Sequence, residues 1–223
     1  MGQREDHNLH GVTLPAMAET SIIGAGRRRF ILHIIQYPHP TLRHPSKPLK
    51  RVDANIAKIV SEMFELMYEA GGIGLAANQV DLPYRLFIAN LAADPEEGEE
   101  LVFINPVLSR PKGNEEKEEG CLSLPKLYAS VKRPETIHLN AYTLNGDEIE
   151  ADVRGLAARV VQHETDHLDG VLFIDRLSET SVIEVKDGLH TFEMEFQSQR
   201  DHGEIPDDEQ ITQRLVELES QYC

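Results

Sequence analysis

The segment Leu156–Leu168 constrains the fold most, because it combines an apolar helical face with side chains that bind metals. Within it, the pattern His163-Glu164-x-x-His167 places two imidazoles four residues apart. On a helix such residues share one face, with Cβ atoms about 5–6 Å apart, so both can bind one metal ion. The Glu164 carboxylate can then reach a water on that metal. This pattern is typical of metal-assisted hydrolysis of an amide or ester.

The patterns before this segment predict a mixture of strands and one further helix. Asp53 can cap a helix with apolar residues at helical spacing, which Gly71-Gly72 ends. Asn145-Gly146 is a strong hairpin signal. Strands are predicted at 85–90, 101–105, 131–141 and 148–153, with charged loops at 94–100 and 112–118. Strands and helices without regular alternation indicate an α+β fold, and we expect mostly antiparallel sheets packed around a central helix that carries the His-Glu-x-x-His motif.

Composition divides the chain of 223 residues into three expected parts. Residues 1–29 are expected to form a poorly ordered leader and residues 30–177 a catalytic domain. Residues 178–223 form an acidic tail, in which 12 Asp or Glu against 3 Lys or Arg leave a net charge of −9. One amphipathic helix is predicted there, through Ile211, Leu215 and Leu218.

Charge and cysteine content limit the partners and the compartment. A formal net charge of −16 argues against broad binding to a nucleic-acid backbone. Two cysteines indicate a reducing compartment. No apolar run in the sequence approaches the roughly 18–20 residues that cross a bilayer. We therefore expect a cytoplasmic protein of bacterial type, without membrane or DNA as partner, and the acidic residues near Arg27-Arg28-Arg29 argue against an organellar targeting peptide.

The third metal ligand has several candidates. A catalytic site of this kind uses three protein ligands and keeps one position open. Cys121, in the segment Glu119-Gly120-Cys121-Leu122-Ser123, is the strongest candidate, although a lone cysteine is more often a packing residue. Glu179 and Glu184 remain as distant carboxylate alternatives.

The segment 72–79 reads Gly-Ile-Gly-Leu-Ala-Ala-Asn-Gln and leaves its backbone accessible. Gln79 ends it with an amide donor. The alternative interpretation is a helix stop followed by a turn of small packing residues.

Together, the motifs Gly-x-Gly-x-Ala-Ala-x-Gln, Glu-Gly-Cys-Leu-Ser and Gln-His-Glu-x-x-His, in this order, resemble those of peptide deformylases. The resemblance extends roughly from Ile35 to Leu177. It implies a metal-dependent hydrolase that removes the formyl group from the N-terminal formyl-methionine of new polypeptides and releases formate. Carried over by position, the metal ligands are Cys121, His163 and His167. Metal-bound hydroxide then attacks the formyl carbon, with Glu164 as general base and acid.

The resemblance also implies the groups that bind the substrate. The Gln79 amide and the Leu122 backbone N–H are expected to donate hydrogen bonds to the oxyanion. The peptide would lie extended beside the backbone on both sides of the site, with the methionine in an apolar slot. The residues implied are Ile73, Gly74, Glu119, Gly120, Leu156 and Val160. Arg159, at a position often apolar in bacterial members, is expected to be a surface residue with its head in water.

Ligand chemistry and the family resemblance favour different metal ions. A thiolate with two imidazoles favours zinc by ligand softness. The family resemblance favours Fe(II), with zinc, nickel or cobalt as other occupants, and we expect Fe(II) because softness does not report which ion the cell supplies.

The implied partners are nascent N-formyl-methionyl peptides, which suggests a location near the ribosome. The acidic tail would be repelled by ribosomal RNA phosphates, so we expect it to mediate self-association or protein contacts instead. Two other functions remain open at this point: an endoprotease that uses the same helix, and a non-catalytic relative with a structural metal and a peptide-binding cleft.

Overall fold

The computed structural model describes residues 32–223, so the predictions for the leader and for a domain start at residue 30 lie outside the described residues. A five-stranded antiparallel sheet has the order β1-β2-β3-β6-β7, and β4 and β5 form a separate two-stranded sheet. The strands are β1 (Gly74–Ala76), β2 (Leu86–Ala89), β3 (Leu101–Lys112), β4 (Glu115–Cys121), β5 (Leu124–Arg133), β6 (Thr136–Tyr142) and β7 (Glu148–Arg154). The helices are α1 (Ala54–Glu69), α2 (Gly155–Leu168), α3 (Glu179–Asp201) and α4 (Asp208–Tyr222), with short 3-10 helices η1 (Pro40–Arg43), η2 (Ala77–Val80) and η3 (Phe173–Arg176).

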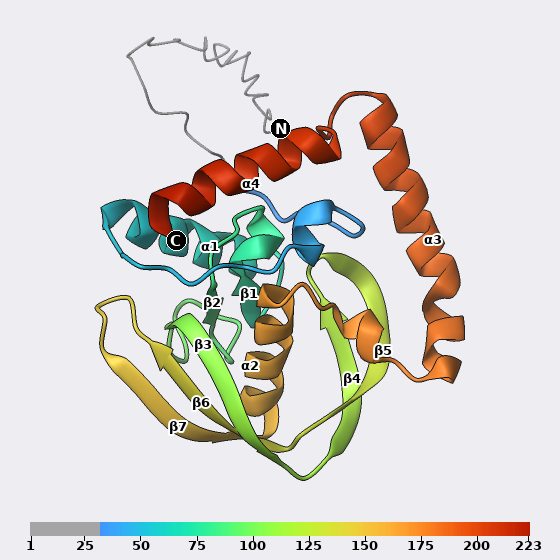
Figure 1. Cartoon of the computed structure of the whole chain (residues 1–223). Helices are drawn as coiled ribbons and strands as arrows, with labels where there is room; N and C mark the ends of the chain where they lie inside the picture. Colours follow the sequence, from blue (N-terminus) through green and yellow to red (C-terminus); the bar gives the residue numbers. More distant parts are fainter. Residues whose placement is uncertain (1–31) are drawn as a thin grey trace, which may run out of the picture. The chain divides into compact units, whose positions relative to one another are not determined.

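Helix α2 lies between the two sheets, which confirms the predicted α+β fold around a central motif helix (Figure 1). Every residue from Ala158 to Leu168 is buried, the polar ones included. Apolar side chains of α2 pack on the five-stranded sheet, whereas its polar side chains face β4 and β5. A helix buried on all sides therefore carries both core and site residues.

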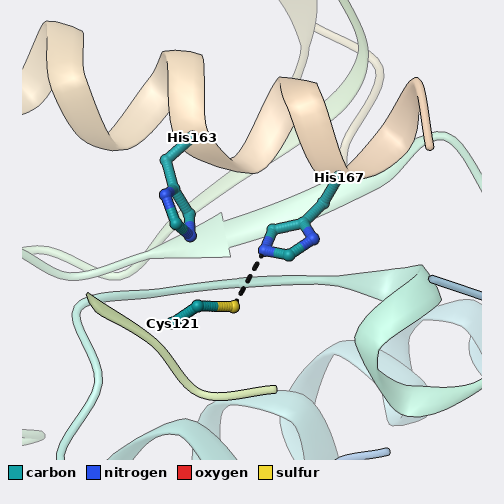
Figure 2. A group of neighbouring side chains, drawn as sticks. All are labelled: Cys121, His163 and His167. Carbon is teal, nitrogen blue, oxygen red and sulfur yellow. Dashed lines mark hydrogen bonds between the residues drawn. The ribbon is translucent and has the colours of Figure 1, made fainter. Parts of the chain in front are cut away.

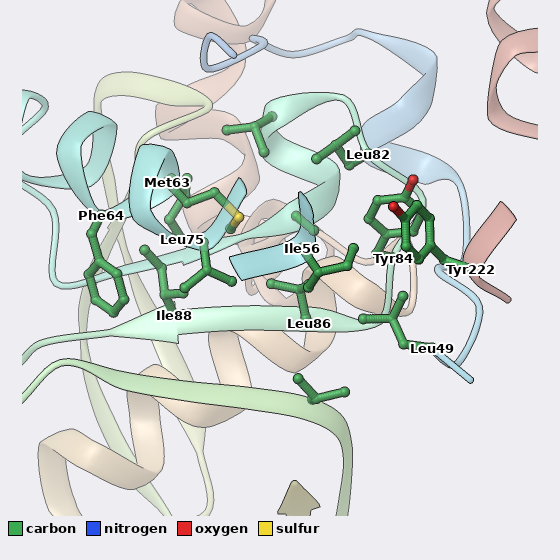
Figure 3. Packing of buried hydrophobic residues seen from close by; sticks show 14 of the residues in the cluster. Leu49, Ile56, Met63, Phe64, Leu75, Leu82, Tyr84, Leu86, Ile88 and Tyr222 are labelled. Carbon is green, nitrogen blue, oxygen red and sulfur yellow. The ribbon is translucent and has the colours of Figure 1, made fainter. Parts of the chain in front are cut away.

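Helix α1 is the helix that the apolar spacing predicted, and it covers the other side of β1 and β2. Its N-terminus is capped by Asp53, whose Oδ1 accepts hydrogen bonds from the backbone N–H groups of Asn55 (2.9 Å) and Ile56 (3.1 Å). The core that it forms with the sheet also includes Tyr222 from the C-terminal end of the chain (Figure 3).

The strand predictions are confirmed for β2, the first part of β3 and the β6–β7 hairpin with its Asn145-Gly146 turn. The predicted charged loop at 112–118 is wrong in part, because β4 begins at Glu115 and pairs with β5. Strand β4 has an unbroken charged run from Glu115 to Glu119, of which the middle three side chains are exposed, so it lacks the apolar alternation that reveals a half-buried strand.

The segment 178–223 contains two helices where the sequence predicted one. Helix α4 is the predicted helix, and it buries Ile211, Leu215 and Leu218 against the rest of the chain. Helix α3 was missed because it buries only Ser181 and Val185, which leaves too little apolar periodicity to recognise. Within residues 32–223, no helix has the length and apolar character needed to span a membrane.

Candidate active site

Three metal-binding side chains meet where α2 passes the end of β4. The ring centroids of His163 and His167 are 4.9 Å apart on successive turns of α2. The Cys121 Sγ atom lies 3.2 Å from His167 Nε2, and the candidate ligand atoms of all three residues lie within 4.8 Å of one another (Figure 2). The alternatives Glu179 and Glu184 lie on α3 and belong to no such group among the described residues.

Cys121 reaches this point because β4 ends in a tight turn. The β4–β5 register shifts between Gly120 and Cys121, and Leu122 and Ser123 form the turn into β5. A Cβ atom on Gly120 would lie 2.6 Å from the Tyr128 ring, so glycine allows these strands to pack. The backbone of Glu119-Gly120-Cys121 therefore directs the thiol toward α2.

The charges around the three side chains suit a divalent cation. Burial would lower the pKa of His163, but hydrogen bonding to Cys121 and Glu119 outweighs this effect and raises the pKa to about 10. The Glu119 carboxylate stabilises positive charge beside the imidazole, and a divalent cation held by Cys121 and the imidazoles would gain the same stabilisation. One thiolate and two imidazoles also form a complete protein ligand set for a catalytic metal. The residues present therefore fit a metal ion.

Glu164 lies beside this group in a nearly dry environment. Burial raises its pKa to about 7, although the positive charges of His163 and Arg133 act in the opposite direction. Its Oε2 atom has no hydrogen-bond partner within residues 32–223. A carboxylate with a pKa near neutrality, and with a free oxygen, is suited to accept and return a proton.

Gly74 on β1 makes room for Glu164. A Cβ atom at position 74 would lie 2.5 Å from Glu164 Oε1 and 3.0 Å from Cδ. The sequence suggested that this bare backbone admits a peptide, whereas the structure adds the Glu164 side chain as a reason for glycine.

We expect Gly74→Ala to lower kcat by about 10- to 100-fold, because displacing a catalytic group by about 1 Å can cost that much. Steady-state kinetics on a formylated peptide measures the effect, with metal content and thermal stability as controls. A rise in KM at unchanged kcat would instead mean that the methyl group obstructs the peptide and leaves Glu164 in place.

The two predicted oxyanion donors lie next to Cys121. Gln79 is buried in η2, and its Oε1 accepts a hydrogen bond of 2.9 Å from the backbone N–H of Ala76. Its Nε2 therefore points the other way, 3.4 Å from Cys121 Sγ and 3.2 Å from Ser123 Oγ. Leu122 directly follows Cys121. Both donors are close to the metal-binding group.

A pocket of about 760 Å³ opens beside the group. All the residues predicted to bind the substrate line it: Ile73, Gly74, Glu119, Gly120, Leu156 and Val160. Leu156 is exposed at the rim, whereas Val160 is buried. The pocket therefore combines an apolar wall from α2 with backbone from β1 and β4.

Glu119 is the centre of a buried network of charges. Burial would raise its pKa, but hydrogen bonds from His163 and Arg133 lower it to about 2, so Glu119 is an anion. Arg133 donates to both of its carboxylate oxygens at 2.6 and 2.9 Å, and His163 Nδ1 lies 3.1 Å from Oε2. Glu119 thus orients the His163 imidazole as well as lining the pocket.

The expectation that Arg159 lies at the surface is wrong. Its side chain is buried, and Nη1 donates to Glu119 Oε1 at 2.6 Å and to the carbonyl oxygen of Val131 at 3.0 Å. Buried anionic and carbonyl oxygens satisfy the guanidinium, so the arginine does not need water.

Sequence reasoning also missed Arg133, which is 2% exposed and bridges Glu119 to Asp166. The sequence of β5 contains a signal for the burial of Arg133. Residues Ala129, Val131 and Arg133 alternate inward along β5, so a charge at the third position implies a buried partner.

Comparisons with known proteins agree with this geometry. The family model for polypeptide deformylase matches residues 31–182. A peptide deformylase from Rhodopirellula baltica is 49% identical over 191 residues, which cover 86% of this chain and 95% of that protein. The chloroplastic peptide deformylase 1B from Solanum lycopersicum is 40% identical over 83% of this chain and 66% of its own length.

Solved structures give the same result. The crystal structure of the plant peptide deformylase PDF1B superposes with a TM-score of 0.75 at 35% identity, and the match covers 82% of this chain and 99% of that one. The peptide deformylase from Synechococcus elongatus, solved in complex with actinonin, gives a TM-score of 0.68 at 38% identity over 72% of this chain and 86% of its own. The family model covers more than half of the chain, and both the sequence identity and the fold agree with it. The chain therefore belongs to the polypeptide deformylase family.

Proposed function

We propose that Cys121, His163 and His167 hold one divalent metal ion and that Glu164 transfers the protons during deformylation. The reaction follows from membership of the family: the protein is a metal-dependent hydrolase that removes the formyl group from N-formyl-methionyl peptides. The observation that supports these residue roles is the meeting of three ligand atoms within 4.8 Å, with the Glu164 carboxyl group beside them.

Each side chain has a distinct task in this reaction. A bound metal would polarise the formyl oxygen and make water a stronger acid. Glu164 takes a proton from the water that adds to the formyl carbon. It returns the proton to the methionine nitrogen as the carbon–nitrogen bond breaks, so that formate and a free amine leave. The Gln79 amide and the Leu122 N–H donate to the oxygen that becomes negative in the transition state.

The pocket supports an extended peptide with a buried methionine side chain. Strand β1 is an edge strand of the five-stranded sheet, so its backbone is open to a further strand. Gly120 on β4 faces the same pocket. Leu156 and Val160 supply apolar surface for the methionine.

Fe(II) is the ion that we propose in the cell, on the strength of the family resemblance. Zinc, nickel and cobalt suit the same ligands. Metal analysis of anaerobically purified protein tests this assignment, and one equivalent of zinc with no iron would overturn it.

The setting that we propose is a cytoplasm of bacterial type, close to nascent chains. Both cysteines are free, as a reducing compartment requires, and 49% identity to the bacterial relative supports it. The apolar face of α4 is buried within the chain, so we do not propose that α4 mediates self-association. Its exposed acidic residues still argue against contact with ribosomal RNA.

Formate release tests the function directly. Fe(II)-loaded wild-type protein is assayed anaerobically on formyl-Met-Ala-Ser, on acetyl-Met-Ala-Ser and on a longer peptide without a formyl group. We expect formate from the first substrate alone and no internal cleavage of the third. Internal cleavage would favour an endoprotease, and the absence of turnover with either Fe(II) or Ni(II) would favour a peptide-binding role.

A further inference from the structure

The oxyanion donor Gln79 lies in a short element with little stability of its own. Helix η2 has only four residues, and its C-cap residue Asp81 is left-handed, with a φ of 64° and a ψ of 32°. Apart from glycine, mainly asparagine and aspartate adopt this conformation, with the help of hydrogen bonds from their short side chains, so the contacts of Asp81 determine how firmly the turn is held. The backbone N–H of Asp81 bonds back to the Asn78 carbonyl at 3.2 Å, which closes a turn that contains Gln79 and Val80.

Several contacts hold η2, among them a backbone hydrogen bond of 2.9 Å from the Ile35 N–H to the Gln79 carbonyl oxygen. The Asn78 side chain donates to the His167 carbonyl oxygen on α2. Arg214 of α4 donates from Nη1 to the Asp81 carbonyl oxygen at 3.0 Å and forms an ion pair with the Asp81 carboxylate. The Thr41 hydroxyl donates to the same carboxylate.

Helix α4, which carries Arg214, is capped and packed against the rest of the chain. Asp207 caps its N-terminus, and the residues on either side of Arg214 on the inward face, Ile211 and Leu215, are buried. Helix α4 lies beside the segment that contains η1 and Thr41 (Figure 1). A second attachment of α4 is separate from η2: Glu219 accepts hydrogen bonds from Lys47 at 2.6 Å and contacts His44 at 2.7 Å.

We infer that Arg214 is a positioning residue for deformylation: by holding Asp81, it fixes the turn that directs the Gln79 amide toward the site. The C-terminal helix is then a support for the oxyanion donor. This inference rests on the proposed role of Gln79. It concerns an arginine more than 130 residues from Gln79 in sequence, outside the matched residues 31–182.

The test compares Arg214→Ala with Glu219→Gln, a matched variant that loosens α4 at its other attachment. We expect Arg214→Ala to lower kcat about tenfold with little change in KM, because losing an oxyanion donor outright costs about 10²–10³. Arg214→Lys should recover part of the loss, since its ammonium can still pair with the Asp81 carboxylate. Glu219→Gln should lower the thermal unfolding temperature and leave kcat within about twofold of wild type.

Two further measurements test whether Arg214 acts on kcat through η2 and Gln79. Amide hydrogen exchange in a peptide covering residues 77–82 should become faster in Arg214→Ala and stay unchanged in Glu219→Gln, with or without metal. In a Gln79→Ala background, Arg214→Ala should have less than about a twofold effect on kcat, because the group it positions is gone.

The outcomes separate the two ideas. An inactive wild type contradicts the proposed function, whereas a fully active Gln79→Ala variant contradicts the proposed role of Gln79 and with it this inference. A wild type that needs Gln79 but tolerates Arg214→Ala overturns the positioning role alone. So does an equal loss of kcat in Glu219→Gln, which would mean that α4 acts only through overall stability.

Discussion

Replacing Glu164 by glutamine is expected to lower kcat by about 10²–10⁴, the range that a positioned acid–base group contributes. Glutamine keeps the size of the side chain and can still form hydrogen bonds, but it cannot accept a proton from water. The burial that raises the pKa of Glu164 to about 7 is what makes it effective in both proton transfers. Metal content and KM should stay near the wild-type values, since Glu164 is not among the three metal-binding residues.

A matched control makes the same substitution elsewhere. Glu116 lies exposed on β4, opposite Lys132 of β5, so Glu116→Gln replaces a carboxylate by an amide without approaching the ligands. Its kcat should equal that of wild type. Equal turnover by Glu164→Gln and wild type, at equal metal content, would remove Glu164 as the base.

The metal-binding helix could be predicted because its information is local. A spacing of four residues puts His163 and His167 on one face wherever the helix packs. Cys121 is different, since its approach to α2 depends on the β4–β5 turn, and no local pattern describes that turn. Sequence reasoning favoured Cys121 but left Glu179 and Glu184 as alternatives, and the family resemblance then assigned the cysteine as the ligand.

The charged network shows where sequence reasoning fails. An arginine is usually exposed, so Arg159 was interpreted as a surface residue. Its burial depends on Glu119, 40 residues away in sequence, and on the carbonyl oxygen of Val131. Burial of Arg159 and Glu119 becomes favourable only when residues from α2, β4 and β5 come together. A single sequence does not show which distant residues will be in contact.

The C-terminal segment was predicted only in part. Its acidic composition describes α3, most of which is exposed, but α3 itself was missed. Acidic composition does not describe the predicted helix α4, where a few apolar residues and Tyr222 enter the core beside Tyr84. Net charge reports the surface of a helix, whereas a few apolar side chains at helical spacing decide whether it docks.

Replacing Cys121 by alanine is expected to abolish tight metal binding and to lower kcat/KM by at least about 10³, because a catalytic metal supplies several kcal/mol of charge stabilisation. The remaining imidazoles of His163 and His167 form an incomplete ligand set. Cys121→Asp should bind metal better than Cys121→Ala, since two imidazoles and a carboxylate also make a catalytic site, but its harder oxygen should change the preferred ion. Metal content measured after dialysis, beside formate release, checks both variants.

Cys223 supplies the control for this prediction, since it is the other cysteine and is also free. Its Sγ donates to the Lys47 carbonyl oxygen, in the region where α4 attaches and away from the ligand group. Cys223→Ala should retain one equivalent of metal and wild-type kcat/KM. If Cys121→Ala also retained its metal after dialysis, the thiolate would be no ligand, and the proposed site would need another third donor. If instead Cys121→Ala lost its metal and kept full activity, the deformylation would not depend on this group at all.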